Sequence, residues 1–516
     1  HIRRTPLKDA SGVSMMDPKT QVSKIHNVSI LDASQKSFES NLVFSLTKQY
    51  PNEQGEKLAN IALNAFVNMN GHPALMAAEA ARANGNSPNT ALSAAIAIMG
   101  KKDAQRAMDA SSALLEIFQR APMADPMGSF DYREQLKEAA KHKEALLGPA
   151  GETCPIIEAA AALGKSVFID FCRDVAKEQK VALSRDTLLA AIWTTLGWNS
   201  LKMRRITRET LIALPWYSKL FSAMVGATAP AKWHDDNAFC GVSMDDLISK
   251  HSFTQTAFMA LLGREATKAE LFEFQALLGL IITNGPGTIS AQGAKGAVSA
   301  DGPEQPDRVQ INKGFVGFLT HTGFAHGGNG YEAAAFLIEQ FKSASLKNPS
   351  DPNHGIDLEK LAMNYAQSYA KYKKAQKDIG NLNYAKIPCV NHPVFKGKAV
   401  NTDPREEFVR NLFKEKGLNN VFLDFYHCLV QALFKTGVSK NVYCVNVDAV
   451  IAVIMLKIVW DDFANGKMNE SDIETASFAT FLFGRMIGCA AEIDDHTNRG
   501  TNMDTRTPAS KCVFVG

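Results

Sequence analysis

The strongest constraint on the fold of this chain is an internal repeat at a nearly fixed distance. The run Val167-Phe168-Ile169-Asp170-Phe171 recurs as Val421-Phe422-Leu423-Asp424-Phe425. An offset of 262 residues then pairs further identical residues: Asp186 with Asp448, Ala190 with Ala452, Ile192 with Ile454, Trp198 with Trp460, Phe221 with Phe483, Met224 with Met486 and Gly226 with Gly488. This register predicts two tandem copies of one module, at 46–230 and 231–516, after an N-terminal arm at 1–45.

The apolar pattern predicts an all-α fold. Apolar residues recur at three- and four-residue spacing in several segments: Glu56–Asn70, Pro73–Asn84, Asp103–Arg120, Phe168–Lys180, Lys268–Ile282 and Tyr331–Ser343. Alternating β-branched runs are almost absent. Residues 286–306 are rich in Gly, Pro and Ala, so we expect a long functional loop there.

Charge and cysteine usage narrow the class of protein. The 56 basic and 53 acidic side chains nearly cancel, and no block of five like charges occurs, which argues against binding to nucleic acid or to a membrane surface. None of the 8 cysteines forms a C-x-x-C pair, so we expect a cytoplasmic protein without a metal centre or a disulfide framework. The longest apolar stretch, Ala449–Trp460, is too short to span a bilayer. The chain begins at His1 rather than Met, as is typical of a trimmed product.

Four polar segments of the second copy contain residues suited to enolate chemistry. They are Asn284-Gly285-Pro286-Gly287-Thr288, then 323–332 with its His-Gly-Gly run, then 387–396 followed by Asp403-Pro404-Arg405, and Val445-Asn446-Val447-Asp448. Glycines beside His326 let a ligand approach the backbone, and the N-terminus of a following helix favours an anion or an enolate oxygen. Two histidines and one carboxylate are what proton abstraction next to a thioester carbonyl needs.

In these segments the chain resembles the citrate synthase superfamily. Ala325–Glu332 is similar to the A-H-G-G-x-N-E signature of that family, and Pro388–Arg405 is similar to its P-G-x-G-H-R-V-x-K segment with the following D-P-R. Asn446-Val447-Asp448 is similar to its N-V-D, and Phe483–Gly488 to the helix F-x-x-S-R-x-x-G. The resemblance covers about 235–516 and implies a citrate synthase-like helical fold, tandem duplicated, with a degenerate first copy.

The resemblance implies a role for each matching residue. Asp448 would take the α-proton of an acyl-CoA, His326 would hydrogen-bond the enolate oxygen, and His392 would polarise and protonate the carbonyl of a 2-oxo acid. The resemblance also implies that the acceptor carboxylates are bound by Arg405, Arg485 and Arg506, and that Arg506 reaches into the site of a partner subunit. The phosphates of coenzyme A would be bound by Lys396 and Lys398.

The chain departs from the family pattern in two segments. Asn284 stands where the family has a histidine that binds the acceptor, and Asn284 can offer only neutral hydrogen bonds to that acid. The stretch 283–290 is similar to T-A-D-H-G-P-A-V-S of citryl-CoA lyase and of the lyase module of ATP-citrate lyase, with the histidine replaced. Cys389-Val390-Asn391 replaces the glycine loop around the adenine of coenzyme A, and Pro393 replaces the usual arginine.

Structural roles remain open for several of these residues. Asp448 precedes an apolar helix and would fit a plain N-cap, and Arg485 could pair with Glu492 or Asp494. In the first copy, Ala223 is in register with Arg485, and no His-Gly-Gly run occurs. We therefore expect the first copy to retain packing residues without chemistry.

The resulting hypothesis is an acyl-CoA-dependent enzyme of the citrate synthase or citryl-CoA lyase type. It would join or split an acetyl-CoA-like thioester and a 2-oxo acid, without a metal. The alternatives are a catalytically degenerate scaffold or regulatory subunit, and a lyase module that works with a CoA-ligase partner subunit. Because Arg506 would act across an interface, we expect a homodimer or a higher oligomer, although the first copy could also serve as a built-in partner.

Overall fold

The computed structural model describes residues 13–147, 166–179, 183–299, 308–392 and 394–498. Within these residues the chain is predominantly helical, which confirms the predicted all-α class. The strands of this part are short: β1 (Ser14–Met16), β2 (Ser23–Ile25) and β3 (Val28–Ser29) form one antiparallel sheet, and β4 (Ala238–Phe239) pairs with β5 (Val242–Ser243).

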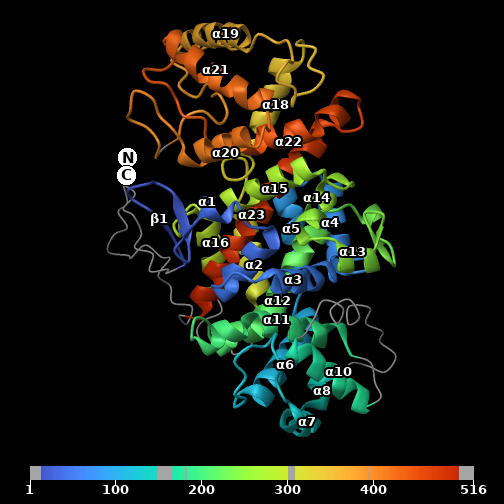
Figure 1. Ribbon diagram of the computed structural model, residues 1–516. Coiled ribbons are helices and arrows are strands. Elements are labelled where there is room, and N and C mark those ends of the chain that lie inside the picture. The colour runs from blue at the N-terminus through green and yellow to red at the C-terminus, as the bar shows by residue number, and fades with distance from the viewer. Residues whose placement is uncertain (1–12, 148–165, 180–182, 300–307, 393, 499–516) are drawn as a thin grey trace.

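The helices form a central body between two lobes (Figure 1). The upper lobe holds α18 (Asn329–Phe341), α19 (Leu358–Asp378), α20 (Pro404–Glu415), α21 (Val421–Lys435) and α22 (Val447–Ala464). The lower lobe holds α6 (Lys101–Phe118), α7 (Arg133–Ala139), η1 (Ala140–His142), α8 (Lys143–Leu146) and α10 (Val167–Gln179), with α11 (Arg185–Lys202) where this lobe meets the body.

The central body is assembled from both ends of the chain. Its first-half elements are α1 (Ile30–Ala33), α2 (Phe38–Thr47), α3 (Glu53–Asn64), α4 (Pro73–Ala83), α5 (Pro88–Ile98) and α12 (Arg208–Gly226). Its second-half elements are η2 (Ala231–Trp233), α13 (Met244–Lys250), α14 (Phe253–Leu262), α15 (Lys268–Leu280), α16 (Ile289–Ser299), α17 (Ile311–Thr320) and α23 (Glu470–Asn498).

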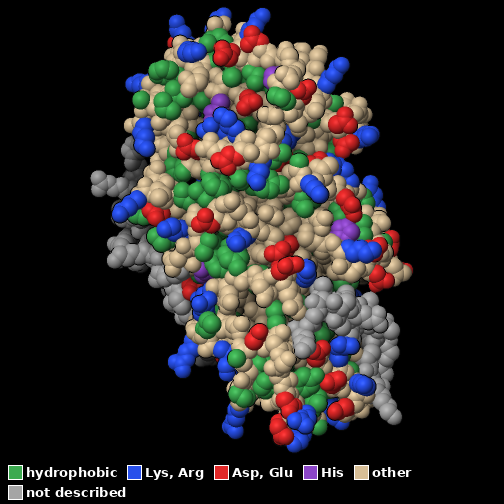
Figure 2. Space-filling model, viewed as in Figure 1, with side chains coloured by type: hydrophobic (Ala, Val, Ile, Leu, Met, Phe, Trp, Pro, Cys, Tyr) green, Lys and Arg blue, Asp and Glu red, His purple; other side chains and the backbone are tan. Residues whose placement is uncertain are grey.

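Helix α23 is the centre of this body. It contacts helices of both halves of the chain, among them α2, α12, α16 and α17. Its length and apolar composition would also suit a membrane span, but its most apolar window is fully buried inside the protein. On the outside, acidic and basic side chains are interspersed over the face in Figure 2.

Local sequence signals set the helix starts. Ser37 accepts a hydrogen bond from the Ser40 amide at the start of α2. Ser252 and Gln255 form a reciprocal capping box at the start of α14. Both arrangements satisfy amides that have no partner within the first helical turn.

Two stretches expected to be irregular are helical or packed. The prediction of a long loop at 286–306 is wrong for 289–299, which forms α16. A Cβ on Gly293 would lie 2.5 Å from the Gly317 carbonyl oxygen, so small residues let α16 and α17 approach closely. Within the expected arm at 1–45, the described residues from 13 onward form β1–β3, α1 and most of α2. Helix α2 is buried on every side and therefore lacks an amphipathic stripe.

Candidate active site

The His-Gly-Gly segment forms a tight loop between α17 and α18. Gly323 and His326 exchange two backbone hydrogen bonds, 3.0 Å from the Gly323 amide to the His326 oxygen and 2.9 Å in the reverse direction. Gly327 has φ +105°, and a Cβ there would lie 2.6 Å from the ring of Phe481. Only glycine satisfies both conditions, so the loop fixes the position of the His326 backbone.

The His326 side chain turns into a buried polar cluster. Its Nε2 lies 2.9 Å from the Ser290 hydroxyl and 3.4 Å from Nη1 of Arg485, and its ring meets Phe481 edge-on at 5.5 Å. Burial, reinforced by the charge of Arg485, lowers the pKa of His326 to about 4. His326 is therefore neutral at physiological pH.

The contacts of Ser290 and Arg485 select one tautomer of this neutral ring. Arg485 donates from Nη1 to the Ser290 oxygen at 3.0 Å, and the same Nη1 lies 3.4 Å from Nε2 of His326. Because a guanidinium can only donate, Nε2 of His326 accepts. The ring proton belongs on Nδ1 of His326, where it can be donated to a ligand.

Arg485 is a buried cation held by neutral groups. Its Nε donates to the Ile281 carbonyl at 2.9 Å, and its guanidinium carbon lies 4.8 Å from the centre of the Phe481 ring. Burial lowers the pKa of Arg485 to about 10. In the described part of the chain it forms no salt bridge, so its charge is available to an anionic ligand.

The carboxylates that could have neutralised Arg485 have other partners. Glu492 lies 3.9 Å from the buried ammonium of Lys295 and accepts a hydrogen bond from Ser14 at 2.5 Å. Asp494 pairs with Arg308 at 2.9 Å. The alternative in which Arg485 pairs with Glu492 or Asp494 is therefore wrong.

Asp448 lies in the first turn of α22, but it is not the N-cap. Asn446 is the cap, and its side chain accepts from the amides of Asp448 and Ala449 at 2.9 and 3.3 Å. Burial lowers the pKa of Arg485 and of His392, and the partly buried Asp448 carboxylate is close enough to oppose part of that lowering. The plain capping role proposed for Asp448 thus belongs to Asn446.

A short β-bridge brings His392 to the start of α22. Val390 pairs with Val445, the Asn391 amide donates to the Cys444 carbonyl at 2.8 Å, and the Asn446 amide donates to the Cys389 carbonyl at 3.1 Å. Cys389 and Asn391, which stand where the family has its glycine loop, have φ of +60° and +68° and so lie in the left-handed region.

His392 is partly buried and has a defined orientation. Its ring stacks on Phe395 with a centroid distance of 4.6 Å, and its Nδ1 accepts a hydrogen bond from the Val394 amide at 3.1 Å. Burial and the charge of Arg405 lower the pKa of His392. The neutral ring therefore carries its proton on Nε2, as a hydrogen-bond donor.

Arg405 is buried and already engaged. Its Nε and Nη2 donate to the two carboxylate oxygens of Asp403 at 2.9 and 2.7 Å, and Asp403 also accepts from the Val447 amide at 3.1 Å. Asp403 thereby ties the start of α20 to the start of α22. Asp403 uses two of the five N–H donors of Arg405, so the outer edge formed by Nη1 and the second hydrogen of Nη2 remains for a bound carboxylate.

Asn284 lies in the turn before α16. Its side-chain oxygen accepts from Ser23 of β2 at 3.4 Å, and the neighbouring Gly285 has φ +94°. Lys295 donates to the Pro286 carbonyl at 3.0 Å and so fastens this turn to α16. The turn is thus supported by a strand from the first half of the chain.

The remaining predicted residues are less constrained. Lys396 and Lys398 are exposed on the segment that follows His392. Arg506 lies outside the residues that the structure describes. Across the described ranges, no group of three or more His, Cys, Asp or Glu side chains is arranged to hold a metal ion.

Two residues of the site had no assigned role in the sequence. Ser290 is fully buried between His326 and Arg485, and Asp403 orients Arg405. Ser290 ends the stretch similar to T-A-D-H-G-P-A-V-S, and Asp403 belongs to the D-P-R segment, so both were within recognised motifs. Their roles depend on contacts that the motifs alone do not show, such as those of Ser290 with His326 and Arg485.

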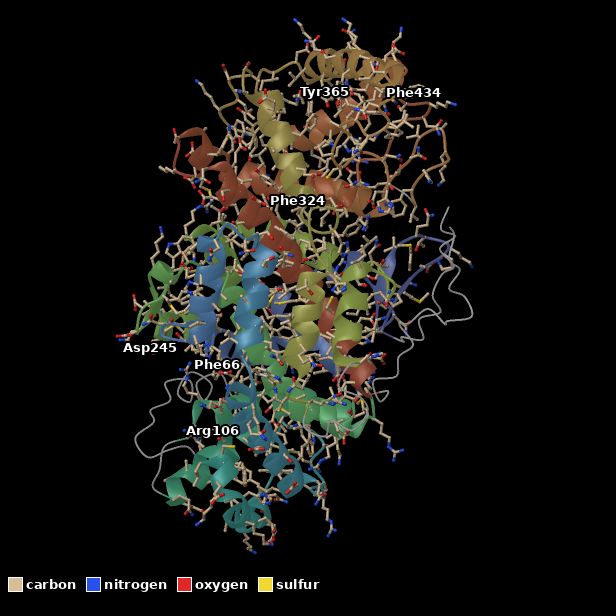
Figure 3. The ribbon with its side chains drawn as sticks, turned by 180° about the vertical axis from the view of Figure 1, so that it is seen from behind. Phe66, Arg106, Asp245, Phe324, Tyr365 and Phe434 are labelled. Atoms are coloured by element: carbon tan, nitrogen blue, oxygen red, sulfur yellow. The ribbon has the colours of Figure 1, made fainter. Side chains whose placement is uncertain are left out.

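Phe324, on the outer side of the His326 loop, faces a cavity that is separate from the polar cluster around His326. Phe324 is 58% exposed and lies where the upper lobe meets the central body (Figure 3). Together with Arg82, Trp233 and Lys467 it lines a cavity of about 820 Å³ between the two halves of the chain. His326 is not among the residues that line this cavity.

The arrangement suits the abstraction of a proton beside a carbonyl group. The central body supplies a neutral imidazole donor and a buried guanidinium, His326 and Arg485. The upper lobe supplies a carboxylate and a second imidazole donor, Asp448 and His392. General acid–base groups of this kind can share the charge that develops as an enolate forms.

No family model and no curated protein matches the chain. Among solved structures, the chain is similar to the citryl-CoA lyase of Hydrogenobacter thermophilus, with 19% identity and a TM-score of 0.40; the alignment covers 54% of this chain and 89% of the lyase. It is similar to citrate synthase of Thermoplasma acidophilum, solved with carboxymethyl coenzyme A and oxaloacetate, with 13% identity and a TM-score of 0.47; the alignment covers 99% of this chain and 94% of the synthase. It is also similar to citrate synthase of Pyrobaculum aerophilum, with 14% identity and a TM-score of 0.48; the alignment covers 95% of this chain and 87% of that synthase. These structures come from the superfamily that the sequence motifs resemble.

Proposed function

We propose that this chain is an acyl-CoA-dependent enzyme that forms or cleaves a carbon–carbon bond between a thioester and a 2-oxo acid. The observation that carries the proposal is the His326 cluster. A neutral imidazole with pKa about 4 is held in one tautomer by Ser290 and Arg485. Asp448 and His392 lie on the facing lobe and interact electrostatically with each other.

In the forward direction, the Asp448 carboxylate takes a proton from the acyl α-carbon. The electron pair moves onto the thioester oxygen, which accepts a hydrogen bond from Nδ1 of His326. The α-carbon then attacks the carbonyl carbon of the 2-oxo acid, and the electron pair of that C=O bond moves onto its oxygen, which takes the proton from Nε2 of His392. The product is a citryl-CoA-like thioester, from which hydrolysis by water releases the thiol of coenzyme A, and the reverse of the carbon–carbon step cleaves the same thioester.

The substrate charges match the cations of the site. The guanidinium of Arg485 is suited to a carboxylate of the acceptor, with Asn284 as a neutral contact. Coenzyme A is the proposed acyl carrier, and the exposed Lys396 and Lys398 are suited to its phosphates. We assign no role to a metal ion.

The test is thiol release from acetyl-CoA in the presence of a panel of 2-oxo acids. The wild-type chain is expected to release thiol with at least one acid, and His326→Ala to lose that activity while retaining its fold by circular dichroism. In the cleavage direction, the wild-type chain would release acetyl-CoA from citryl-CoA. If the wild type is as inert as His326→Ala in both directions, the enzyme proposal is wrong.

A second candidate is a catalytically degenerate scaffold or regulatory subunit. It is favoured by the departures from the family pattern at the acceptor and coenzyme A contacts, Asn284 and Cys389-Val390-Asn391. Calorimetry separates the two: a scaffold that has lost the reaction together with its ligands would bind neither coenzyme A nor a 2-oxo acid. Co-purification with a nucleotide-binding CoA ligase would instead support a lyase module of a larger assembly.

A further inference from the structure

Equivalent helices occur at equivalent positions in the two halves of the chain, before and after residue 231. Adding 262 to the bounds of α11 gives the bounds of α22, and adding it to the first residue of α12 gives the first residue of α23. The β2–β3 hairpin is matched by the β4–β5 hairpin at an offset of 214. Ile25 pairs with Val28 in the first, and Phe239 pairs with Val242 in the second.

Equivalent residues also make equivalent contacts. Trp198 meets Phe168 at 5.2 Å and 62°, and Trp460 meets Phe422 at 5.2 Å and 60°. A Cβ on Gly226 would lie 2.2 Å from the Val67 oxygen, while one on Gly488 would lie 2.3 Å from the Ile282 oxygen. The halves therefore share a fold as well as a helical pattern, and the repeat begins within the expected arm.

Helices α5 and α17 are equivalent, and they cap each other. Asn89, at the second position of α5, donates to the carbonyls of Leu319 and Thr322 at 3.1 and 3.0 Å. Asn312, at the second position of α17, donates to the carbonyls of Ile96 and Met99 at 3.3 and 2.7 Å. When residue i contacts j and the equivalent of j contacts the equivalent of i, the interface has twofold symmetry.

The starts of α2 and α14 mark the axis of this relation. Phe38 and Phe253 follow equivalent serine caps and stack on each other at 5.4 Å with 14° between their planes. Around them the packing is crossed, because α1 packs on α15 whereas α13 packs on α3. The Asn64 side chain of α3 donates to the Leu247 carbonyl of α13 at 3.1 Å.

Within its described residues, the first half has no counterpart of the His326 loop or of Arg485, and its counterpart of Asp448 is engaged in a salt bridge. Only Met99 and Gly100 connect α5 to α6, where the second half has the eight-residue His326 loop between α17 and α18. Ala223 stands in register with Arg485 and is buried. Asp186, the counterpart of Asp448, forms a salt bridge with Lys219.

The first half nevertheless supports the second-half site directly. Asn89 holds Leu319 in the last turn of α17 and Thr322 at the start of the His326 loop. Ser23 contacts Asn284, and Ser14 contacts Glu492 beside Lys295. These three contacts come from residues of the first half that precede the position where the second half has its His326 loop.

We propose that the first half is a built-in, non-catalytic partner subunit, so that one chain forms a complete twofold pair with a single working site. The pairing itself is independent of chemistry, whereas the single working site rests on the enzyme proposed above. On this proposal one chain needs no second chain to complete its site, in contrast to the homodimer or higher oligomer expected from Arg506.

Chemical cross-linking of the full chain tests the pairing. After treatment with an amine-reactive cross-linker, denaturing electrophoresis separates single chains from linked pairs, and each band is digested for peptide mass spectrometry. We expect lysine links between the two halves in the single-chain band, since they arise within one molecule. If such links occur only in the band of two chains, or in neither band, the pairing is wrong. This result is independent of whether the chain is an enzyme.

Two matched substitutions test the support of the site. Asn89→Ala and Asn312→Ala remove equivalent side chains and are expected to lower Tm by similar amounts. Asn89→Ala should also lower kcat by on the order of ten- to a hundredfold, because it loosens the segment that positions His326. Asn312→Ala should leave kcat unchanged, since α5 leads to no catalytic loop. Equal kcat losses, or none, would overturn the supporting role, and a specific activity that falls on dilution would overturn the single-chain site.

Discussion

The protonation of His326 is the sharpest quantity that the structure predicts. Its pKa falls from 6.5 to about 4 because the ring is buried beside Arg485. In ¹³C-histidine NMR spectra, the His326 resonance is assigned as the one that is missing from the spectrum of His326→Asn. Its chemical shift should therefore begin to change with pH only below about pH 5. A midpoint near 6.5 would refute the buried, neutral imidazole on which the proposed chemistry depends.

The same shift has a consequence for stability. Because the unfolded chain binds this proton more tightly, the contribution of the neutral ring is complete above pH 6.5 and is lost as the pH falls towards 4. Relative to pH 7.5, the wild type loses about 2 kcal/mol at pH 5 and about 3 kcal/mol below pH 4 through this group.

Comparison of the wild type with His326→Asn isolates the pH-dependent contribution of this ring to the free energy of unfolding. Urea unfolding at pH 7.5 and pH 5 should show a stability difference between wild type and variant that shifts by about 2 kcal/mol against the wild type at the lower pH. His26 is a control, because burial lowers its pKa to about 4 as well, and it lies outside the site. His26→Asn should show the same pH-dependent shift without loss of activity. A stability difference that does not change with pH would contradict the linkage.

Three further outcomes follow from the packing. Ser290→Ala removes the hydroxyl between His326 and Arg485, so we expect kcat to fall by on the order of a hundredfold with the fold retained, and the ring ¹⁵N shifts of His326 to move towards a mixture of tautomers. Gly488→Ala should cost about 1–3 kcal/mol in urea unfolding, because its Cβ would lie 2.3 Å from a backbone oxygen; an unchanged midpoint would contradict that packing. Lys457→Met leaves the buried Glu273 without its cation and should cost about 3–5 kcal/mol, whereas adding Glu273→Leu should restore most of the lost stability in the same measurement.

The residues of the candidate site were largely predictable from local motifs. The segments of His326, His392, Asp448 and Arg485 were each recognised in the sequence, and the structure brings their side chains into electrostatic or hydrogen-bonding contact. The partners of these residues were less accessible. Whether Arg485 pairs with Glu492, or Arg405 with Asp403, depends on which atoms the fold brings within hydrogen-bonding distance.

Two differences from the predicted secondary structure both arise from close packing, although in different ways. Helix α2 is buried on every side, and α16 contains small residues at its contact with α17. Periodicity detects a helix through the contrast between a wet face and a dry face, and that contrast is absent in α2. In α16, glycines that resemble a loop in the sequence are required by the close approach of two helices.

The sequence by itself determined the helical class, the repeat register and the residue types of the candidate site, because each depends on local patterns or on identities at a fixed offset. Only the tertiary structure decided that Asn446 rather than Asp448 caps α22, that Arg405 is engaged by Asp403, and that equivalent Asn89 and Asn312 cap each other's helices. These are contacts between residues distant in the chain, and their distances are set by the packing of the whole fold.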